Sequence, residues 1–409
     1  MKKIIIIGLI YFFCNSTFAD ISPLNSKLQA VVDHDRDKYH LTSLSVSIKL
    51  PEESAPRNFV SGYYAQNQKQ KITPDTLFQI GSITKTFTAT IILKLVEEKK
   101  LHLNDKIGRY IPQYPKWKNI TISQLLYHTS GTFEYMHSNG FWENLSNNPD
   151  QYHSLDDLAS LAYLYPVNFK PGTKNNYSNT DYILLGLIIE KVTYTSIQTT
   201  FNHYLQVHNL KNTFFTPRGY PDNTKNRIAH GYCYEDDTFG HHQDVTFVGM
   251  SDGQTAGAMI STPHDLIDWL EQFFSGKIVS KHSLAQMMTM VSPKNAKPLT
   301  KNICPPIAKM PLVEVGYGLG MGLVYFPKYG FSWVHAGGTP GYESFFSYNP
   351  CKNIYAVVMY GQKPKKQLIF AQIESDLFKV IDEASVVQSQ VEQYQKTHTL
   401  PDYCVCSGI

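Results

Sequence analysis

The sequence has only a small excess of basic residues and, beyond its N-terminus, no long apolar run. Its 409 residues include 37 Lys and Arg against 34 Asp and Glu, a formal net charge of +3. Lysine and arginine form no basic stripe, which argues against a nucleic-acid partner. No later segment approaches the ~20 apolar residues that cross a bilayer, so we expect no transmembrane segment in the mature chain.

Metal-binding patterns are also lacking. No H-E-x-x-H motif occurs, and the cysteine spacings match no zinc site. The pair His241-His242 has no second ligand cluster at matching spacing, so we expect a solvated loop there and neither a metal nor an organic cofactor. A bridge between Cys304 and Cys351 is one pairing that the sequence allows. The odd count of cysteines after residue 19 leaves at least one thiol unpaired in an oxidising compartment, among Cys233, Cys304, Cys351, Cys404 and Cys406.

The N-terminus has the pattern of a secretory signal peptide. Two lysines precede the apolar run 4–13, and small residues around Ala19 form a cleavage site. The run is too short to span a bilayer. We therefore expect residues 1–19 to be removed and the mature protein to be periplasmic or secreted. Retention of this segment as an interfacial anchor is the alternative.

The remaining chain has the composition of a globular protein, with 42% hydrophobic and 17% charged residues, and no repeat divides it. Alternating apolar patterns between turn residues predict strands near both ends of the chain, at 44–50, 58–65, 318–326, 331–336, 342–349 and 354–361. Caps and helical periodicity predict helices at about 82–100, 180–193, 262–274 and 366–395.

This order of elements predicts an α/β (α+β) fold. An antiparallel sheet domain, flanked by N- and C-terminal helices, would be built from both ends of the chain, with an all-helical domain inserted between them. The expected boundaries are about 20–80 and 251–385 for the sheet part and about 81–250 for the helical part. The remaining residues, 386–409, would form a C-terminal tail.

A single charge lies in the apolar and threonine-rich segment from Ser82 to Leu93, and it is Lys85. On a helix, positions 82 and 85 lie on one side, and a helix that is apolar on both sides is buried. Burial lowers the pKa of a lysine, and a neutral lysine can activate a neighbouring hydroxyl. Gly81 would let the backbone approach closely before the helix begins. The plainer interpretation is that Ser82 caps a helix and Lys85 reaches solvent.

Two further clusters carry groups that suit catalysis. Tyr177 and Asn179 precede a helix, where a loop can point a phenol and an amide into a cleft, unless they only cap that helix. His335 ends a strand and is followed by Gly337 and Gly338, against which a substrate could lie. A backbone N–H from this segment could form an oxyanion hole with that of Ser82.

Together, Ser82-x-x-Lys85, Tyr177-x-Asn179 and His335-Ala336-Gly337 resemble, in this order, the motifs of the penicillin-recognising serine hydrolases. This family includes class C β-lactamases, D-alanyl-D-alanine carboxypeptidases and related esterases. The similarity extends over about residues 30–380, including the blocks ISQLLYHTSGT and GQTAGAMISTPHDL.

The resemblance implies a role for each position. Ser82 would be the acylated nucleophile, Lys85 its partner base and Tyr177 a proton relay. Asn179, His335 and Gly337 would contact the substrate, and the oxyanion hole would be the N–H groups of Ser82 and Gly338. The fold implied is a helical domain beside an α/β domain, with the site between them.

The third motif departs from the Lys-Thr-Gly of many β-lactamases of this type. His-Ala-Gly lacks the permanent charge and the hydroxyl, and a neutral histidine holds a carboxylate less firmly. The resemblance therefore implies a D-alanyl-D-alanine carboxypeptidase-like activity first, on a small peptide, amide or ester substrate of the kind that peptidoglycan supplies. A small-ester esterase, a weak class C-like β-lactamase and a penicillin-binding or sensor module without turnover are the alternatives.

One rival nucleophile is Ser251, which lies in a G-x-S-x-G sequence at 249–253. In α/β-hydrolases this motif follows a strand and opens a helix. The following residues make a poor helix, and the alternating parallel units of that fold are missing. We therefore expect a glycine-rich connection at this position. His128, in the block YHTSG, is expected to be structural.

Overall fold

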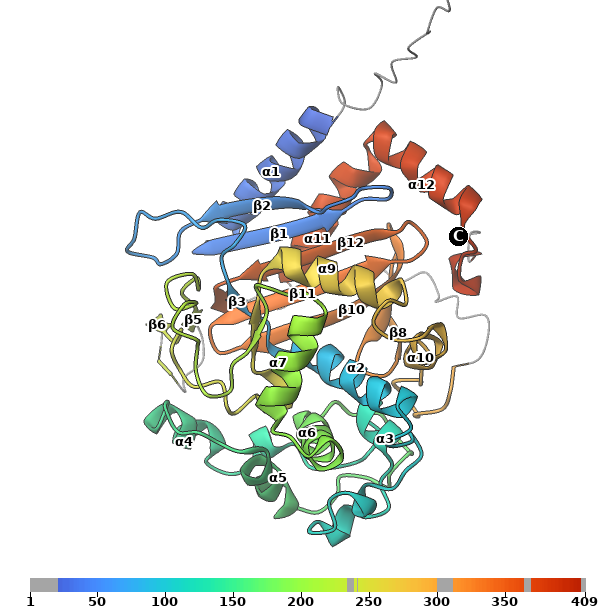
Figure 1. Cartoon of the computed structure of the whole chain (residues 1–409). Helices are drawn as coiled ribbons and strands as arrows, with labels where there is room; N and C mark the ends of the chain where they lie inside the picture. The colour runs from blue at the N-terminus through green and yellow to red at the C-terminus, as the bar shows by residue number, and fades with distance from the viewer. Residues whose placement is uncertain (1–20, 234–238, 241, 300–311, 364–368, 406–409) are drawn as a thin grey trace, which may run out of the picture.

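The computed structural model describes residues 21–233, 239–240, 242–299, 312–363 and 369–405 (Figure 1). The predicted signal peptide, His241, Cys304 and Cys406 lie outside these residues. Within the described ranges, no helix combines the length and the apolar character needed to cross a membrane.

A seven-stranded antiparallel sheet forms the centre of the molecule, in the order β2-β1-β12-β11-β10-β9-β8. The N-terminal strand β1 pairs directly with the C-terminal strand β12, with Val46 opposite Val358. This pairing confirms the predicted antiparallel sheet built from both ends of the chain. The strands are β1 (Ser43–Lys49), β2 (Arg57–Gly62), β8 (Val313–Tyr317), β9 (Gly322–Phe326), β10 (Gly330–Thr339), β11 (Tyr342–Asn349) and β12 (Ile354–Tyr360).

Strand β8 is an edge strand that the sequence did not predict. It has five residues, and its register to β9 shifts between Glu314 and Gly316. A short segment with a glycine and an irregular register lacks the strict alternation from which strands are recognised. Pairing with β9 therefore stabilises it as a strand.

Both faces of the sheet are covered by helices. Along β12, Ala356 and Val358 face one apolar cluster, whereas Val357 and Met359 face the other, as the two-residue period of a strand requires. The first cluster includes side chains of α1 (Ile21–Lys38), α11 (Ile369–Asp382) and α12 (Ser385–Thr397). Helix α9 (Pro263–Phe274) lies across the opposite face (Figure 1).

The predicted single helix at 366–395 is wrong, because the chain turns between α11 and α12. Ala384 is extended, with φ −86° and ψ 112°, and α12 begins at Ser385. No glycine or proline marks this break in the sequence. The turn allows Val387 and Val391 of α12 to be buried in the same cluster as α11.

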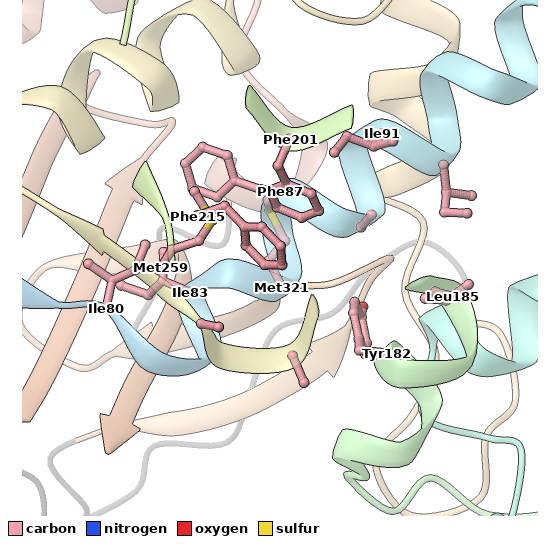
Figure 2. Packing of buried hydrophobic residues seen from close by; sticks show 14 of the residues in the cluster. Ile80, Ile83, Phe87, Ile91, Tyr182, Leu185, Phe201, Phe215, Met259 and Met321 are labelled. Carbon is pink, nitrogen blue, oxygen red and sulfur yellow. The ribbon is translucent and has the colours of Figure 1, made fainter. Parts of the chain in front are cut away.

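Helix α2 (Thr84–Glu97) runs through the core beneath the sheet. Its residues from Thr84 to Leu93 are all buried, as the apolar character on both sides predicted. The Phe87 ring stacks on Trp269 of α9 at 4.1 Å between centroids. Figure 2 shows Phe87 beside Phe201 and Phe215, so α2 is enclosed by side chains from several segments.

The remaining helices lie in the part of the chain between β3 (Phe78–Gln79) and β8. Apart from single-turn 3₁₀ segments, they are α3 (Ile122–Leu126), α4 (Phe141–Asn147), α5 (Leu155–Tyr163), α6 (Asn179–Thr193), α7 (Ile197–Val207), α8 (Gln254–Gly257) and α10 (Lys281–Met287). Two small sheets complete the fold, β3 (Phe78–Gln79) with β7 (Met259–Ser261) and β4 (Phe214–Phe215), and β5 (Tyr232–Cys233) with β6 (Gln243–Asp244) and β13 (Gln362–Lys363).

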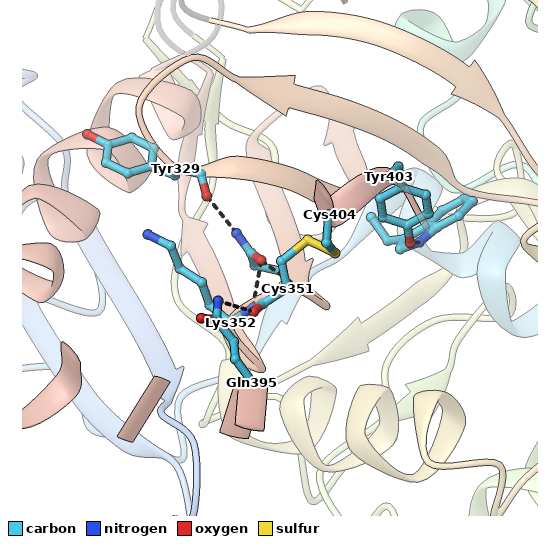
Figure 3. The surroundings of a disulfide bond; sticks show 8 residues. Tyr329, Cys351, Lys352, Gln395, Tyr403 and Cys404 are labelled. Carbon is cyan, nitrogen blue, oxygen red and sulfur yellow. Dashed lines mark hydrogen bonds between the residues drawn. A yellow bond between two sulfur atoms is a disulfide. The ribbon is translucent and has the colours of Figure 1, made fainter. Parts of the chain in front are cut away.

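A disulfide ties the C-terminal segment to the sheet (Figure 3). It joins Cys351, in the turn between β11 and β12, to Cys404, with 5.6 Å between the Cα atoms. The suggested bridge from Cys304 to Cys351 is therefore wrong. Beside the bridge, Trp333 of β10 donates a hydrogen bond from Nε1 to the Tyr403 hydroxyl at 3.1 Å. Helix α12 returns toward this turn and brings the two cysteines together, which no local sequence pattern predicts.

Candidate active site

Ser82 lies in a tight turn between β3 and α2. The preceding Gly81 has φ +46°, and a Cβ at that position would lie 2.7 Å from the backbone nitrogen of Gly338. A 3₁₀ turn over Gly81–Ile83 then leads into α2. Glycine at position 81 therefore permits both the left-handed backbone and the close approach of β10 to the turn that carries Ser82.

Lys85 points from the first turn of α2 toward Ser82. Its Nζ lies 3.0 Å from Ser82 Oγ, 2.7 Å from Asn179 Oδ1 and 2.8 Å from the carbonyl oxygen of Ala256. The side chain is fully buried. Burial lowers the pKa of Lys85 to about 7, although the negative charges of Glu134 and Asp181 oppose this shift. Near neutral pH the amine therefore exists in both charged and neutral forms.

Tyr177 contacts both Ser82 and Lys85. Its hydroxyl hydrogen-bonds to Ser82, and its ring centroid lies 4.8 Å from Lys85 Nζ. Although 43% of the residue is exposed, the hydroxyl itself is buried, and this burial raises the pKa of Tyr177. The phenol is therefore protonated near neutral pH and can donate or pass on a proton.

Asn179 begins α6 and is held from the other side by Glu134. The Glu134 carboxylate accepts hydrogen bonds from the backbone N–H of Asn179, from its Nδ2 at 3.3 Å and from the N–H of Met136 at 3.2 Å. Only 7% of Glu134 is exposed, and burial raises the pKa of its carboxyl. These contacts orient the Asn179 amide so that its oxygen faces Lys85.

His128 packs against the Tyr177 ring, and Asp181 lies next to His128. The His128 ring lies 4.4 Å from the Tyr177 ring, and its Nδ1 is 3.1 Å from Asp181 Oδ2. Asp181 is fully buried and also accepts hydrogen bonds from Ser130 and Thr132, while burial raises its pKa to about 8. His128 is thus part of the packing behind the site, in a left-handed backbone conformation with φ 55°.

The third motif runs along β10 beside Ser82. His335 is 6% exposed, its Nδ1 donates to the carbonyl of Ala336 at 2.7 Å, and its Nε2 is 3.3 Å from the Tyr317 hydroxyl. Burial and the charge of Lys85 lower the pKa of His335 to about 3. The ring is therefore neutral near pH 7, and both nitrogens already have partners.

The two glycines of this motif differ. A Cβ on Gly337 would lie 1.9 Å from the carbonyl oxygen of Ile80, so a side chain there would separate β10 from the Ser82 turn. A Cβ on Gly338 would meet no atom within 4 Å, because this residue faces a cavity. Gly337 is thus required for packing, whereas Gly338 leaves its backbone open to a ligand.

A cavity of about 220 Å³ opens at Ser82. Ser82, Gly338 and Asn179 all line it, so the two residues of the predicted oxyanion hole share one cavity with Asn179. The other lining residues come from β3, the 136–145 segment, the 245–257 segment and the end of β10, namely Gln79, Met136, Trp142, Leu145, Val245, Val248, Gly249, Met250, Asp252, Gly253, Ala256, Gly257, Thr339 and Pro340.

The rival serine has a structural role. Ser251 is 2% exposed, and its hydroxyl accepts a hydrogen bond from the His153 N–H at 2.9 Å and donates one to the carbonyl of Gln151 at 3.2 Å. No strand leads into it, and the helix that follows has four residues. Within the described part of the chain, no group of three or more His, Cys, Asp or Glu side chains could hold a metal ion.

Sequence reasoning missed Glu134, Asp181 and Tyr317. Each is buried or half-buried. Glu134 contacts Asn179 and Tyr317 contacts His335, both predicted site residues, whereas Asp181 contacts His128 behind Tyr177. Glu134 is the second residue after the block ISQLLYHTSGT, and its charge between Phe133 and Tyr135 was the available signal.

With this geometry established, comparison with known proteins identifies the family. A family model described as Beta-lactamase matches residues 28–371. The chain belongs to the beta-lactamase family of penicillin-recognising serine hydrolases. The resemblance noted from the three motifs is thereby confirmed at the level of the family.

Relatives of known name match parts of the chain. Protein flp of Staphylococcus aureus strain MW2 is 34% identical over 200 residues, which are 47% of this chain and 39% of that protein. Penicillin-binding protein 4* of Bacillus subtilis is 28% identical over 302 residues, 69% of this chain and 60% of that protein. The matches therefore span less than two thirds of each of these relatives.

The D-amino acid amidase of Ochrobactrum anthropi SV3 is a solved structure with a similar fold. That structure, a complex with L-phenylalanine amide, has a TM-score of 0.73 at 24% identity and covers 88% of this chain and 99% of its own. At this identity the similarity shows the shared fold. The beta-lactamase-like architecture predicted from the sequence is confirmed.

Proposed function

We propose that this family member is a serine hydrolase that acts through an acyl-enzyme on Ser82. The observation that carries the proposal is the fully buried Lys85 amine, 3.0 Å from Ser82 Oγ, with its pKa lowered to about 7. A neutral amine at this distance can accept the hydroxyl proton as the oxygen attacks. A lysine directed to solvent could not.

In the proposed reaction, Ser82 Oγ attacks the substrate carbonyl while its proton passes to Lys85. The oxyanion is stabilised by the N–H groups of Ser82 and Gly338, which line the cavity together. Tyr177 then delivers a proton to the leaving amine or alcohol, and the carbonyl–leaving-group bond breaks. Lys85 returns its proton to Tyr177. Water then adds to the acyl-enzyme and gives a proton to Lys85, and this proton passes to Ser82 Oγ as the ester bond to Ser82 breaks.

The substrate is proposed to be a small peptide, amide or ester, with Asn179 contacting its amide and Gly337 forming part of the strand edge beside it. The sequence favoured a peptide ending in D-alanyl-D-alanine and an exported enzyme, and both remain proposals. A neutral His335 binds a terminal carboxylate of the substrate less strongly than a cation at this position would. Amide substrates are supported by the fold shared with a D-amino acid amidase.

Labelling and turnover test the proposal together. A fluorophosphonate and a labelled penicillin should modify Ser82, as located by mass spectrometry of peptides. Ser82→Ala should lose labelling and turnover while its circular dichroism spectrum stays unchanged. Full activity in that variant, or a label on Ser251, would refute the assignment.

The same assay separates an enzyme from a sensor module. An enzyme should release product continuously from p-nitrophenyl esters, amino acid amides or D-alanyl-D-alanine peptides. A single stoichiometric burst without turnover on all three substrate classes would instead support a module that is acylated and stays acylated.

A further inference from the structure

The cavity beside Ser82 has a chemical character that narrows the substrate class, if the proposed function is right. Large apolar side chains from two separate segments line it, namely Met136, Trp142, Leu145, Val245, Val248 and Met250. Such a lining suits an apolar or aromatic side chain.

The cavity also contains one acidic residue. Among the residues lining the cavity, Asp252 is the one ionisable side chain, and it is acidic. Its carboxylate accepts hydrogen bonds from its own backbone N–H and from that of Gly253, and burial raises its pKa to about 6. No cation partners it there, so a positively charged ligand group would relieve its desolvation.

Positive charge near the site is already engaged. Lys85 directs its amine at three oxygen atoms within the protein, and the neutral His335 has partners on both nitrogens. Arg218 stacks over the Tyr152 ring at 4.1 Å, and neither residue lines the cavity. In the part of the chain that the structure describes, a substrate carboxylate would therefore find no free cation at this cavity.

We infer that the preferred substrates are amides or esters of amino acids with a free α-ammonium group and an apolar side chain, and that Asp252 binds the ammonium. The reaction releases ammonia, an amine or an alcohol from the acyl group, and water then frees the amino acid from Ser82. Peptides that bind through a terminal carboxylate fit this site poorly. Asp252 would thus be a specificity-determining residue.

Matched substrate pairs test this inference. Phenylalaninamide should be hydrolysed about 10-fold or more faster, in kcat/KM, than N-acetylphenylalaninamide, because a charge-assisted hydrogen bond is lost on acetylation. Each enantiomer is assayed at pH 7, where Asp252 is ionised and the substrate amine is mostly protonated. A dipeptide with a free carboxylate should be poorer than the same dipeptide amide. Equal rates, or a preference for the acetylated or carboxylate-ended substrate, would overturn the inference.

Variants assign the preference to Asp252. Asp252→Asn should reduce the ratio of kcat/KM for free over acetylated substrate by about 10-fold, mainly through a higher KM for the free amine. Asp222→Asn, which removes one exposed negative charge outside the cavity, should keep the wild-type ratio. An unchanged ratio in Asp252→Asn, with fluorophosphonate labelling of Ser82 showing an intact site, would contradict the role of Asp252.

Different results would contradict the proposed acyl-enzyme on Ser82 and the inferred substrate class. If Ser82→Ala retains hydrolysis, the acyl-enzyme itself is wrong. If Ser82 is labelled and required but the wild type ignores the ammonium group, the acyl-enzyme stands and the substrate class is wrong.

Discussion

At the scale of single residues, the burial of one lysine amine sets the chemistry of the site. Lys85 sits among Ser82, Asn179 and the carbonyl of Ala256, and burial lowers its pKa while nearby carboxylates raise it. Its protonation is thus a balance between desolvation and charge. The pH dependence of the reaction should report this balance directly.

The value of kcat/KM should fall as the pH decreases through about 7, because Lys85 must be neutral in the free enzyme to accept the Ser82 proton. Initial rates between pH 5 and 9 measure this decrease, which is the acid limb of the plot of kcat/KM against pH. Lys85→Ala should reduce the rate at least ~10²-fold. A near-normal rate in this variant, or no acid limb near neutral pH, would show that the lysine is structural.

Glu134→Gln should move the same acid limb to lower pH. The negative charge of Glu134 raises the pKa of Lys85, so its removal stabilises the neutral amine. The rate should also fall, since the glutamine cannot accept all the N–H groups that Glu134 now receives from Asn179 and Met136.

Glu143→Gln is the matched control, because Glu143 is an exposed glutamate on α4. Its acid limb should coincide with that of the wild type. A slower Glu134→Gln enzyme with an unmoved limb would show that Glu134 acts by packing and hydrogen bonding alone.

At the scale of elements, β10 and the turn before α2 meet through glycines. Roles were assigned from the sequence to the glycines at both places. Helices α6 and α9 were also placed correctly, because caps and periodicity act over a few residues. For α9, Thr262 caps the helix and Pro263 occupies its first turn. The break between α11 and α12 was missed because no glycine or proline marks it. The edge strand β8 was missed because it is short and its register to β9 is irregular.

Gly337→Ala should destabilise the protein and reduce activity sharply. The new Cβ would lie 1.9 Å from a backbone carbonyl, which cannot move as a flexible side chain can. Overpacking of this kind costs about 1–3 kcal/mol, and chemical denaturation measures it.

Gly338→Ala is the comparison for the neighbouring position, where a Cβ meets no atom within 4 Å. It should keep the wild-type unfolding free energy and affect binding in the cavity. If both variants unfold at the same denaturant concentration as the wild type, the contact between β10 and the Ser82 turn is looser than described here.

At the scale of the whole molecule, the two ends of the chain meet in one sheet. Strand β1 pairs with β12, and the last described residues return to the sheet through the Cys351–Cys404 bridge and the contact between Trp333 and Tyr403 (Figures 1 and 3). Trp333 is two residues before His335 on β10. The C-terminal segment therefore supports the strand that carries the third motif.

Cys404→Ser should lower the free energy of unfolding by about 2–4 kcal/mol, since the bridge closes a loop with a sequence separation of 53. Thermal unfolding with and without reductant measures the effect. The wild type should lose stability on reduction, and the variant should lose less. Equal sensitivity of both proteins to reductant would contradict a stabilising role for this bridge.

Local patterns in the chain were enough to predict the antiparallel sheet, a buried helix at about 82–100, observed as α2, and the family motifs. Apolar periodicity, caps and short motifs are all expressed within a few consecutive residues. Folding alone decided that Cys351 pairs with Cys404, that Glu134 holds Asn179, and that Asp252 lies in the cavity beside Ser82. These contacts join residues tens to more than a hundred positions apart. Their energies depend on distance and burial in space, which no short stretch of sequence encodes.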